Sequence, residues 1–62
     1  MLGKNLARIR EAKRLGVNEL ARLAGVNAGY ISAIEKGTRK NPSFKILDKI
    51  AAALGVSVDR LT

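Results

Sequence analysis

The side chains of this sequence that could do chemistry are mostly cationic, and they lie in two segments. Lysine and arginine total 12 against 5 acidic residues, which gives a formal net charge of +7 over 62 residues. All of this excess comes from residues 1–14, with a net charge of +4, and residues 38–45, with +3. A soluble surface usually intersperses its signs, so two separated basic segments suggest a polyanionic partner. A solvated basic face is the alternative interpretation.

The residue types on which most enzymes depend are missing. The chain has no cysteine and no histidine, which removes the thiol nucleophile, the commonest metal ligand and the commonest general base. The carboxylates are scattered, and their spacing suits neither a metal site nor an acid–base pair: Glu11, Glu19, Glu35, Asp48 and Asp59. We therefore expect no enzyme, no catalytic residue, no metal, no cofactor and no small-molecule ligand.

The secondary-structure elements that position the basic segments are all predicted to be helices. The apolar period predicts an all-α fold of four helices, over about 3–14, 17–24, 28–36 and 44–54, plus a short fifth turn through Val58 and Leu61. The chain is short enough for a single domain over residues 1–62. No apolar run approaches the roughly 18 residues needed to span a membrane, so we expect a cytoplasmic protein with no membrane partner.

Each predicted helix has an inward stripe and end signals. The first stripe includes Leu2, Leu6, Ile9 and the stem of Lys13; the others include Leu20 and Leu23, then Ile31 and Ile34, then Phe44, Leu47, Ile50 and Leu54. Gly25, Gly37 and Gly55 are placed to end helices. Asn27, Ser43 and Ser57 are placed to cap the helices that follow.

Residues 17–36 form a unit of two short helices joined by a three-residue turn. Ala21 and Ala24 are small enough for the helices to cross closely, and Gly25 makes the turn. If the isoleucines of the second helix face inward, its remaining positions face outward, and that helix could enter a DNA major groove. The outward positions are Ala28, Gly29, Ser32, Ala33 and Lys36.

Nearly the whole chain resembles the Cro/C1-type (XRE) helix-turn-helix family of bacterial and phage repressors. The matching blocks come in order and at the family's spacing: residues 6–10, 19–26, 30–37, 41–43 and 54–58. The resemblance implies a lambda-repressor-like fold with its helix-turn-helix at about 17–36. It also implies a repressor-type transcriptional regulator that binds double-stranded DNA, with the third helix in the major groove.

The resemblance also implies roles for individual residues. Base edges would be faced by Asn27, Ala28, Gly29, Ser32 and Ala33. Phosphates would be faced by Asn18, Tyr30, Lys36, Arg39, Lys40, Asn41 and Lys45. Arg10 and Glu35 match positions that form a structural ion pair between the first and third helices. Family members usually bind as homodimers on two-fold operators.

Two alternatives stay open. The outward residues of the third helix are short, and bidentate base readout needs long polar side chains, so a protein-interaction module on the same fold is the second functional hypothesis. The chain also shows no obvious long dimerisation helix. It is either an excised domain of a longer regulator or a self-contained protein with a small interface near its C-terminus.

Overall fold

Four α-helices and a final 3₁₀ turn make up the chain, and there is no β-strand. The computed structural model describes residues 1–62, with α1 (Leu2–Ala12), α2 (Val17–Ala24), α3 (Ala28–Lys36), α4 (Phe44–Leu54) and η1 (Val58–Arg60). The predicted all-α fold, with a helix-turn-helix over about 17–36, is confirmed. The first helix ends before residue 14, where we expected it to end, because Arg14 takes a left-handed conformation with φ of 58°. No helix has both the length and the apolar character needed to cross a membrane.

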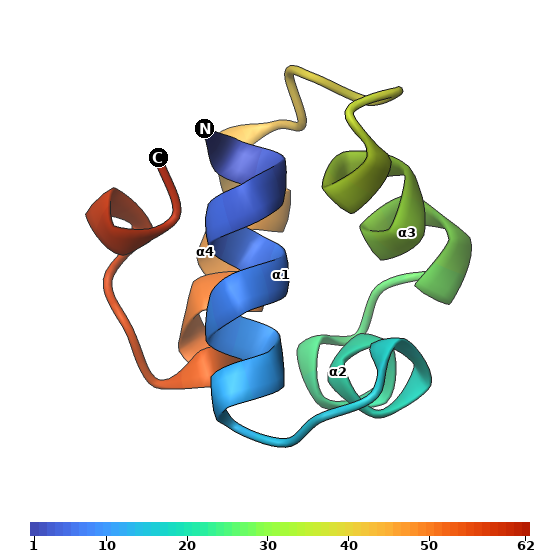
Figure 1. Cartoon of the computed structure of the whole chain (residues 1–62), viewed down its shortest axis with the longest axis vertical. Coiled ribbons are helices and arrows are strands. Elements are labelled where there is room, and N and C mark those ends of the chain that lie inside the picture. Colours follow the sequence, from blue (N-terminus) through green and yellow to red (C-terminus); the bar gives the residue numbers. More distant parts are fainter.

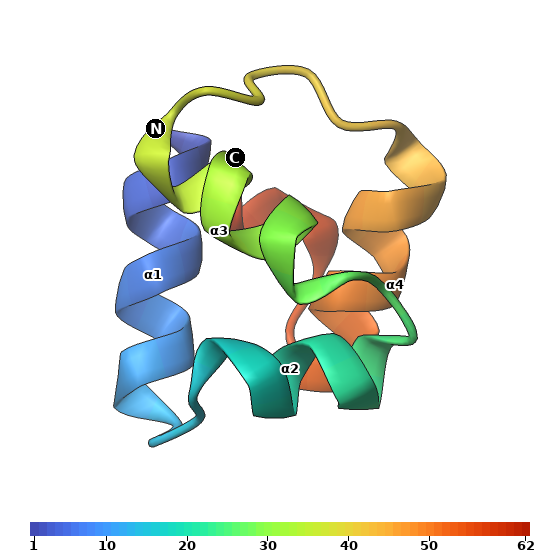
Figure 2. The same cartoon turned by 90° about the vertical axis from the view of Figure 1, so that its right-hand side faces the viewer.

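The helices enclose one small core. In Figure 2, α1 and α4 stand on two sides of the molecule, α2 crosses below them and α3 lies in front. The α2 helix packs against both α3 and α4, whereas α1 packs against α3. Figure 1 shows η1 on the side of the molecule opposite α3. The largest side chains that are completely buried come from all four helices and the C-terminal end: Leu6, Leu20, Ile31, Ile34, Ile50 and Leu61.

Local signals in the sequence set most of the helix ends. Gly25, Gly37 and Gly55 each follow a helix in the left-handed conformation, as predicted. Asn27 Oδ1 accepts a hydrogen bond from Gly29 N at 2.7 Å, and Ser43 Oγ accepts one from Ile46 N at 3.2 Å. These bonds satisfy backbone donors that the first turn of a helix leaves free. Ser57 makes no such bond, so the prediction of a side-chain cap there is wrong.

Three side chains predicted to face the core are exposed. Leu23 is 60% exposed because the inward stripe of α2 follows Leu20 and Ala21, which turns Leu23 toward solvent. Phe44 is 69% exposed, since it is the first residue of α4 and lies at the edge of the stripe that starts at Leu47. Lys13 lies beyond the last turn of α1 and is also exposed.

The C-terminal end of the chain is tied to α1. Asn5 Nδ2 donates a hydrogen bond to the carbonyl oxygen of Leu61 at 3.2 Å, and the Leu61 side chain is completely buried. The residues nearest the two ends of the chain therefore contribute to the same core.

Gly3 allows α1 and α3 to approach each other closely. A Cβ atom at this position would lie 2.5 Å from the carbonyl oxygen of Ile34 and 2.9 Å from that of Glu35. Both atoms belong to the backbone of α3, which cannot rotate away as a flexible side chain could. A side chain at position 3 would push the two helices apart.

We expect Gly3→Ala to lower the free energy of unfolding by about 1–2 kcal/mol, because the clash exceeds the roughly 1 kcal/mol that alanine gains over glycine in a helix. Thermal unfolding followed by circular dichroism measures this. Lys4→Ala, at the exposed neighbouring position, is the control and should change stability by less than about 0.5 kcal/mol. Equal or higher stability of the Gly3 variant would contradict the close approach.

Candidate nucleic-acid interface

The α2 and α3 helices form the helix-turn-helix, and α3 has an open outer side. The turn between them is Gly25, Val26 and Asn27; Val26 N donates to the carbonyl oxygen of Ala21 at 3.0 Å. Ile31 and Ile34 hold the inner side of α3 in the core. Figure 2 shows α3 across the front of the molecule, with no other element lying over it. One side of this helix is therefore free to contact a partner.

The side chains on the outer side of α3 are short. Gly29 is exposed, and Ser32 and Ala33 are partly exposed. Ala28 is partly buried and packs against the core. It therefore lies at the edge of the outer face, whereas the sequence pattern predicts a position within that face. Asn27 is exposed; its side-chain oxygen caps α3, and its amide nitrogen forms no hydrogen bond within the chain and can donate to a partner.

The loop after α3 folds back onto the helix. Thr38 N and Arg39 N both donate to the carbonyl oxygen of Ala33, at 3.0 and 3.1 Å, and Thr38 Oγ1 donates to the same oxygen at 3.1 Å. The Arg39 guanidinium carbon then lies 4.4 Å from the centre of the Tyr30 ring. That distance is within the range of a cation–π contact. The start of the basic loop is therefore fixed against α3.

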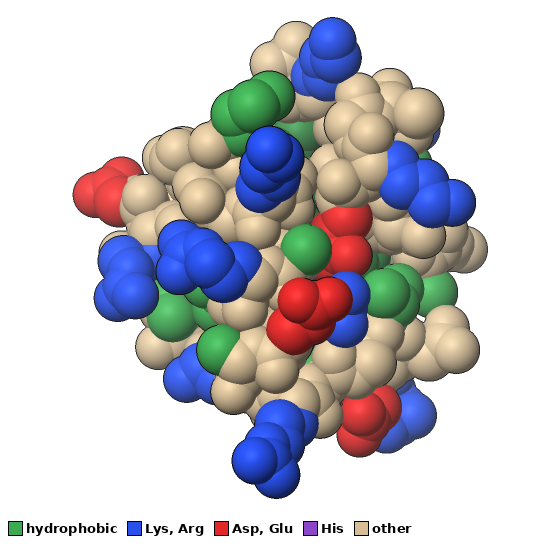
Figure 3. All heavy atoms as spheres, in the orientation of Figure 1, with side chains coloured by type: hydrophobic (Ala, Val, Ile, Leu, Met, Phe, Trp, Pro, Cys, Tyr) green, Lys and Arg blue, Asp and Glu red, His purple; other side chains and the backbone are tan.

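The other residues predicted to face phosphates are all exposed. Figure 2 shows the loop over residues 38–43 crossing from the end of α3 to the start of α4. Lys and Arg side chains are spread around the face shown in Figure 3; acidic side chains lie near its centre, where α1 and α3 meet, and also at its left edge and lower right. The exposed residues that were predicted to face phosphates are Asn18, Lys36, Lys40, Asn41 and Lys45.

Arg10 and Glu35 join α1 to α3 through two hydrogen bonds. Arg10 Nε donates to Glu35 Oε2 at 2.7 Å, and Arg10 Nη2 donates to Glu35 Oε1 at 3.0 Å. The third donor, Arg10 Nη1, reaches the carbonyl oxygen of Leu15 at 2.8 Å, just before α2. Both side chains are only 13% exposed. The hydrogen bonds that Arg10 donates to the Glu35 carboxylate raise the pKa of Arg10 above its ordinary value.

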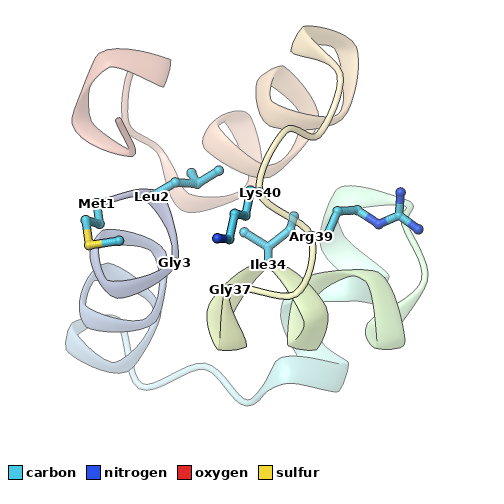
Figure 4. A pocket seen from close by; sticks show the side chains of 7 residues that line it. All are labelled: Met1, Leu2, Gly3, Ile34, Gly37, Arg39 and Lys40. Carbon is cyan, nitrogen blue, oxygen red and sulfur yellow. The ribbon is translucent and has the colours of Figure 1, made fainter.

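A pocket of about 250 Å³ lies between the first turn of α1 and the end of α3. This is slightly smaller than the roughly 300–1,000 Å³ of typical ligand pockets. Figure 4 shows Met1, Leu2 and Ile34 around it, with Lys40 above the pocket and Arg39 directed away from it, along α3. The two neighbouring basic residues of the loop therefore point to different surfaces.

Sequence reasoning missed four features of this region. Gly3 is the point of close backbone approach between α1 and α3. A glycine inside a helical pattern is the sequence signal that could have indicated it. Nothing in the apolar period indicated that Asn5 would bind the C-terminal end, that Leu15 would accept from Arg10, or that Arg39 would stack on Tyr30. These contacts join residues that no local pattern relates.

The chain is a small all-α domain. The second helix of its helix-turn-helix is exposed and is followed by a basic loop, which places the chain in the class of small helix-turn-helix domains. The helix-turn-helix family model matches residues 6–61, so the chain belongs to the helix-turn-helix family of the Cro/C1 (XRE) type.

The curated relatives that the chain matches are named as HTH-type transcriptional regulators. The chain is 41% identical over 61 residues to the HTH-type transcriptional regulator SinR of Bacillus subtilis, covering 98% of this chain and 55% of SinR. It is 38% identical to SlrR of the same organism, covering 40% of that protein. The chain thus spans about half the length of the first of these relatives, and less of the second.

Solved structures show the same fold. A crystal structure of SinR, the master regulator for biofilm formation, in complex with DNA superposes with a TM-score of 0.95, at 41% identity and with 98% of this chain and 97% of that chain covered. The restriction-modification controller protein C.AhdI of Aeromonas hydrophila has a TM-score of 0.93 at 34% identity, with 98% and 91% covered.

We expect Glu35→Ala to lower the free energy of unfolding by about 2–3 kcal/mol, because it leaves the largely buried Arg10 without its anionic partner. For a domain of this size that corresponds to a fall of roughly 10 °C or more in melting temperature. Calorimetry or circular dichroism measures it.

Glu11→Ala is the matched control. Glu11 is also close to Arg10, with 3.7 Å between Oε2 and Nη2, but its side chain is 70% exposed. An exposed pair of this kind contributes less than about 1 kcal/mol. If the Glu35 variant kept its melting temperature, the Arg10–Glu35 pair would not be the tie that holds α1 to α3.

Proposed function

We propose that this chain is a single DNA-binding domain, residues 1–62, of a transcriptional regulator that binds double-stranded DNA. The observation that carries the proposal is the close match, over 98% of the chain, to SinR in its complex with DNA. The net charge of +7 supports it, because the phosphate backbone supplies much of the affinity in such complexes.

The outer face of α3 would enter the major groove. An α-helix is about 10–12 Å in diameter and the groove is about 12 Å wide, so the fit is close. Gly29 has no side chain, and those of Ser32 and Ala33 are short, which allows the helix backbone to approach the base edges. Methyl groups such as that of Ala33 can contact the thymine methyl but cannot form hydrogen bonds.

The exposed polar residues around α3 would contact phosphates and set the orientation of the domain. Asn18 lies in the first turn of α2, Lys36 in the last turn of α3 and Lys45 in the first turn of α4. Lys40 and Asn41 lie in the loop between α3 and α4. Such contacts position a protein on the duplex without reading its sequence. We also propose that two copies bind a two-fold operator, with half-sites about one helical turn apart.

A protein-interaction module is the second candidate function. Leu23 and Phe44 are large apolar side chains that are 60% and 69% exposed, and both lie outside the proposed contact helix. Protein partners favour such side chains, whereas phosphates do not. A chain that binds random duplex DNA without a steep salt dependence would favour this candidate.

We expect Lys40→Ala to weaken binding to all duplexes and to reduce the slope of log K against log salt by about one. Fluorescence anisotropy with a random-sequence duplex at several salt concentrations measures this. Arg60→Ala removes the same charge from η1, which Figure 1 shows on the side opposite α3, and should leave the slope unchanged. If the Arg60 variant showed the larger change, the DNA-facing side would be wrongly assigned.

We expect selected binding sites to discriminate weakly at most positions, with specific binding about 10³-fold tighter than non-specific binding. Replacing thymine by uracil in a selected site removes only the methyl group, and it should weaken binding at one or more positions. Competition assays with singly substituted duplexes measure the effect. Should every substitution, together with Ser32→Ala, leave affinity unchanged, α3 is not the element that reads the sequence.

A further inference from the structure

The proposed DNA-reading face contains no long polar side chain of its own near its start. The residues of α3 that approach a groove first are those of its N-terminal part, where the helix carries Gly29, Ser32 and Ala33. The side chain of Asn27 is short, and its oxygen is held in the cap of α3. A long side chain that can form a bidentate hydrogen bond to a base at this end of α3 must therefore come from outside the helix.

Arg39 is the side chain that reaches this region. Its backbone lies after the end of α3, but its guanidinium lies over the ring of Tyr30, in the first turn of α3, at 4.4 Å from the ring centre. Figure 4 shows the Arg39 side chain running from the loop away from the pocket and along α3. The loop thus delivers a long cationic side chain to a part of the helix that has none.

Both ends of this arrangement are held in place. Arg39 N donates to the carbonyl oxygen of Ala33, and the neighbouring Thr38 donates to the same oxygen twice. Tyr30 is partly buried and packs against the core, so its ring is a supported surface for the guanidinium. Arg39 itself is exposed and forms no ion pair with any carboxylate.

The contact with the Tyr30 ring leaves the N–H donors of the guanidinium free, because none of them forms a hydrogen bond within the chain. The guanidinium is planar, and its N–H donors point outward in that plane. Two of these donors match the O6 and N7 acceptors that guanine presents in the major groove. A phosphate contact would not require the guanidinium to lie beside the first turn of α3.

We propose that Arg39, positioned by Tyr30, is the residue that determines sequence specificity, by reading one guanine in the major groove beside the start of α3. This inference rests on the proposed DNA-binding function and replaces the phosphate contact that the family resemblance implied for Arg39. Tyr30 is then a positioning residue. The base preference of the protein is then strong at one guanine of each half-site and weak at the other base pairs.

The test uses a duplex selected from a randomised pool and single-atom changes at each of its guanines. Replacement by 7-deazaguanine removes the N7 acceptor in the major groove, whereas inosine removes only the amino group in the minor groove. One guanine per half-site should lose roughly tenfold in affinity with 7-deazaguanine and little with inosine. If no guanine responds to the loss of N7, the proposal is overturned.

Protein variants separate reading from charge. Arg39→Lys keeps the charge but has no planar fork, so it should keep the salt slope while losing the response to 7-deazaguanine. Tyr30→Phe keeps the ring and should behave like the unaltered chain, whereas Tyr30→Leu should lose roughly as much guanine discrimination as Arg39→Lys. Melting curves of each variant confirm that it is folded under the binding conditions.

The experimental outcomes separate failure of the Arg39 proposal from failure of the proposed DNA-binding function on which it rests. Steep salt-dependent binding with full discrimination in Arg39→Lys would leave DNA binding intact and overturn the role of Arg39. A chain that fails to bind any duplex at low salt would overturn the proposed function, and the reading of guanine with it. Loss of discrimination in Tyr30→Phe would show that the hydroxyl group, and not the ring, positions the contact, which would overturn the stacking argument.

Discussion

The arrangement of the whole domain depends on the contacts of one side chain, Arg10. Its guanidinium donates to Glu35 in α3 and to the carbonyl oxygen of Leu15 before α2, so a single planar group fixes three elements. At the other end of α1, Gly3 lets the same two helices approach through their backbones. Contacts near both ends of α1, at Gly3 and at Arg10, therefore hold the C-terminal end of α3. The outer face of α3 can then consist of small side chains, because nothing on that face is needed to hold the helix in place.

The elements with strong local signals could be predicted from the sequence. Gly25, Asn27, Gly37 and Ser43 have the conformations or caps that their residue types favour, because those preferences act over only a few residues. Leu23 and Phe44 were assigned to the core wrongly. The α2 helix has only 8 residues, too few for its apolar period to fix the direction of Leu23, and Phe44 is the first residue of α4, at the edge of the buried stripe. The pairing of Arg10 with Glu35 was suggested by family resemblance and could not be obtained from spacing, because the two residues lie on different helices.

The contacts that define the candidate interface are tertiary, which is why the sequence alone did not give them. Arg39 was expected to meet phosphates, as a basic residue in a basic loop. Its stacking on Tyr30 follows from the way residues 38 and 39 fold back on Ala33, and no local pattern specifies that fold. The sequence alone shows that Gly29 and Ala33 are short outward residues. Only the structure shows that the neighbouring loop brings the long side chain of Arg39 to this part of α3.

The most direct test of the account is a titration of the isotopically labelled chain with duplex DNA, followed by amide chemical shifts. We expect the largest changes in the first turn of α2, in α3 and in residues 38–45. Residues of η1 and the exposed Leu23, by contrast, should stay unchanged. Changes centred on η1 or Leu23, with α3 unaffected, would contradict the claim that α3 and its basic loop form the DNA-binding surface.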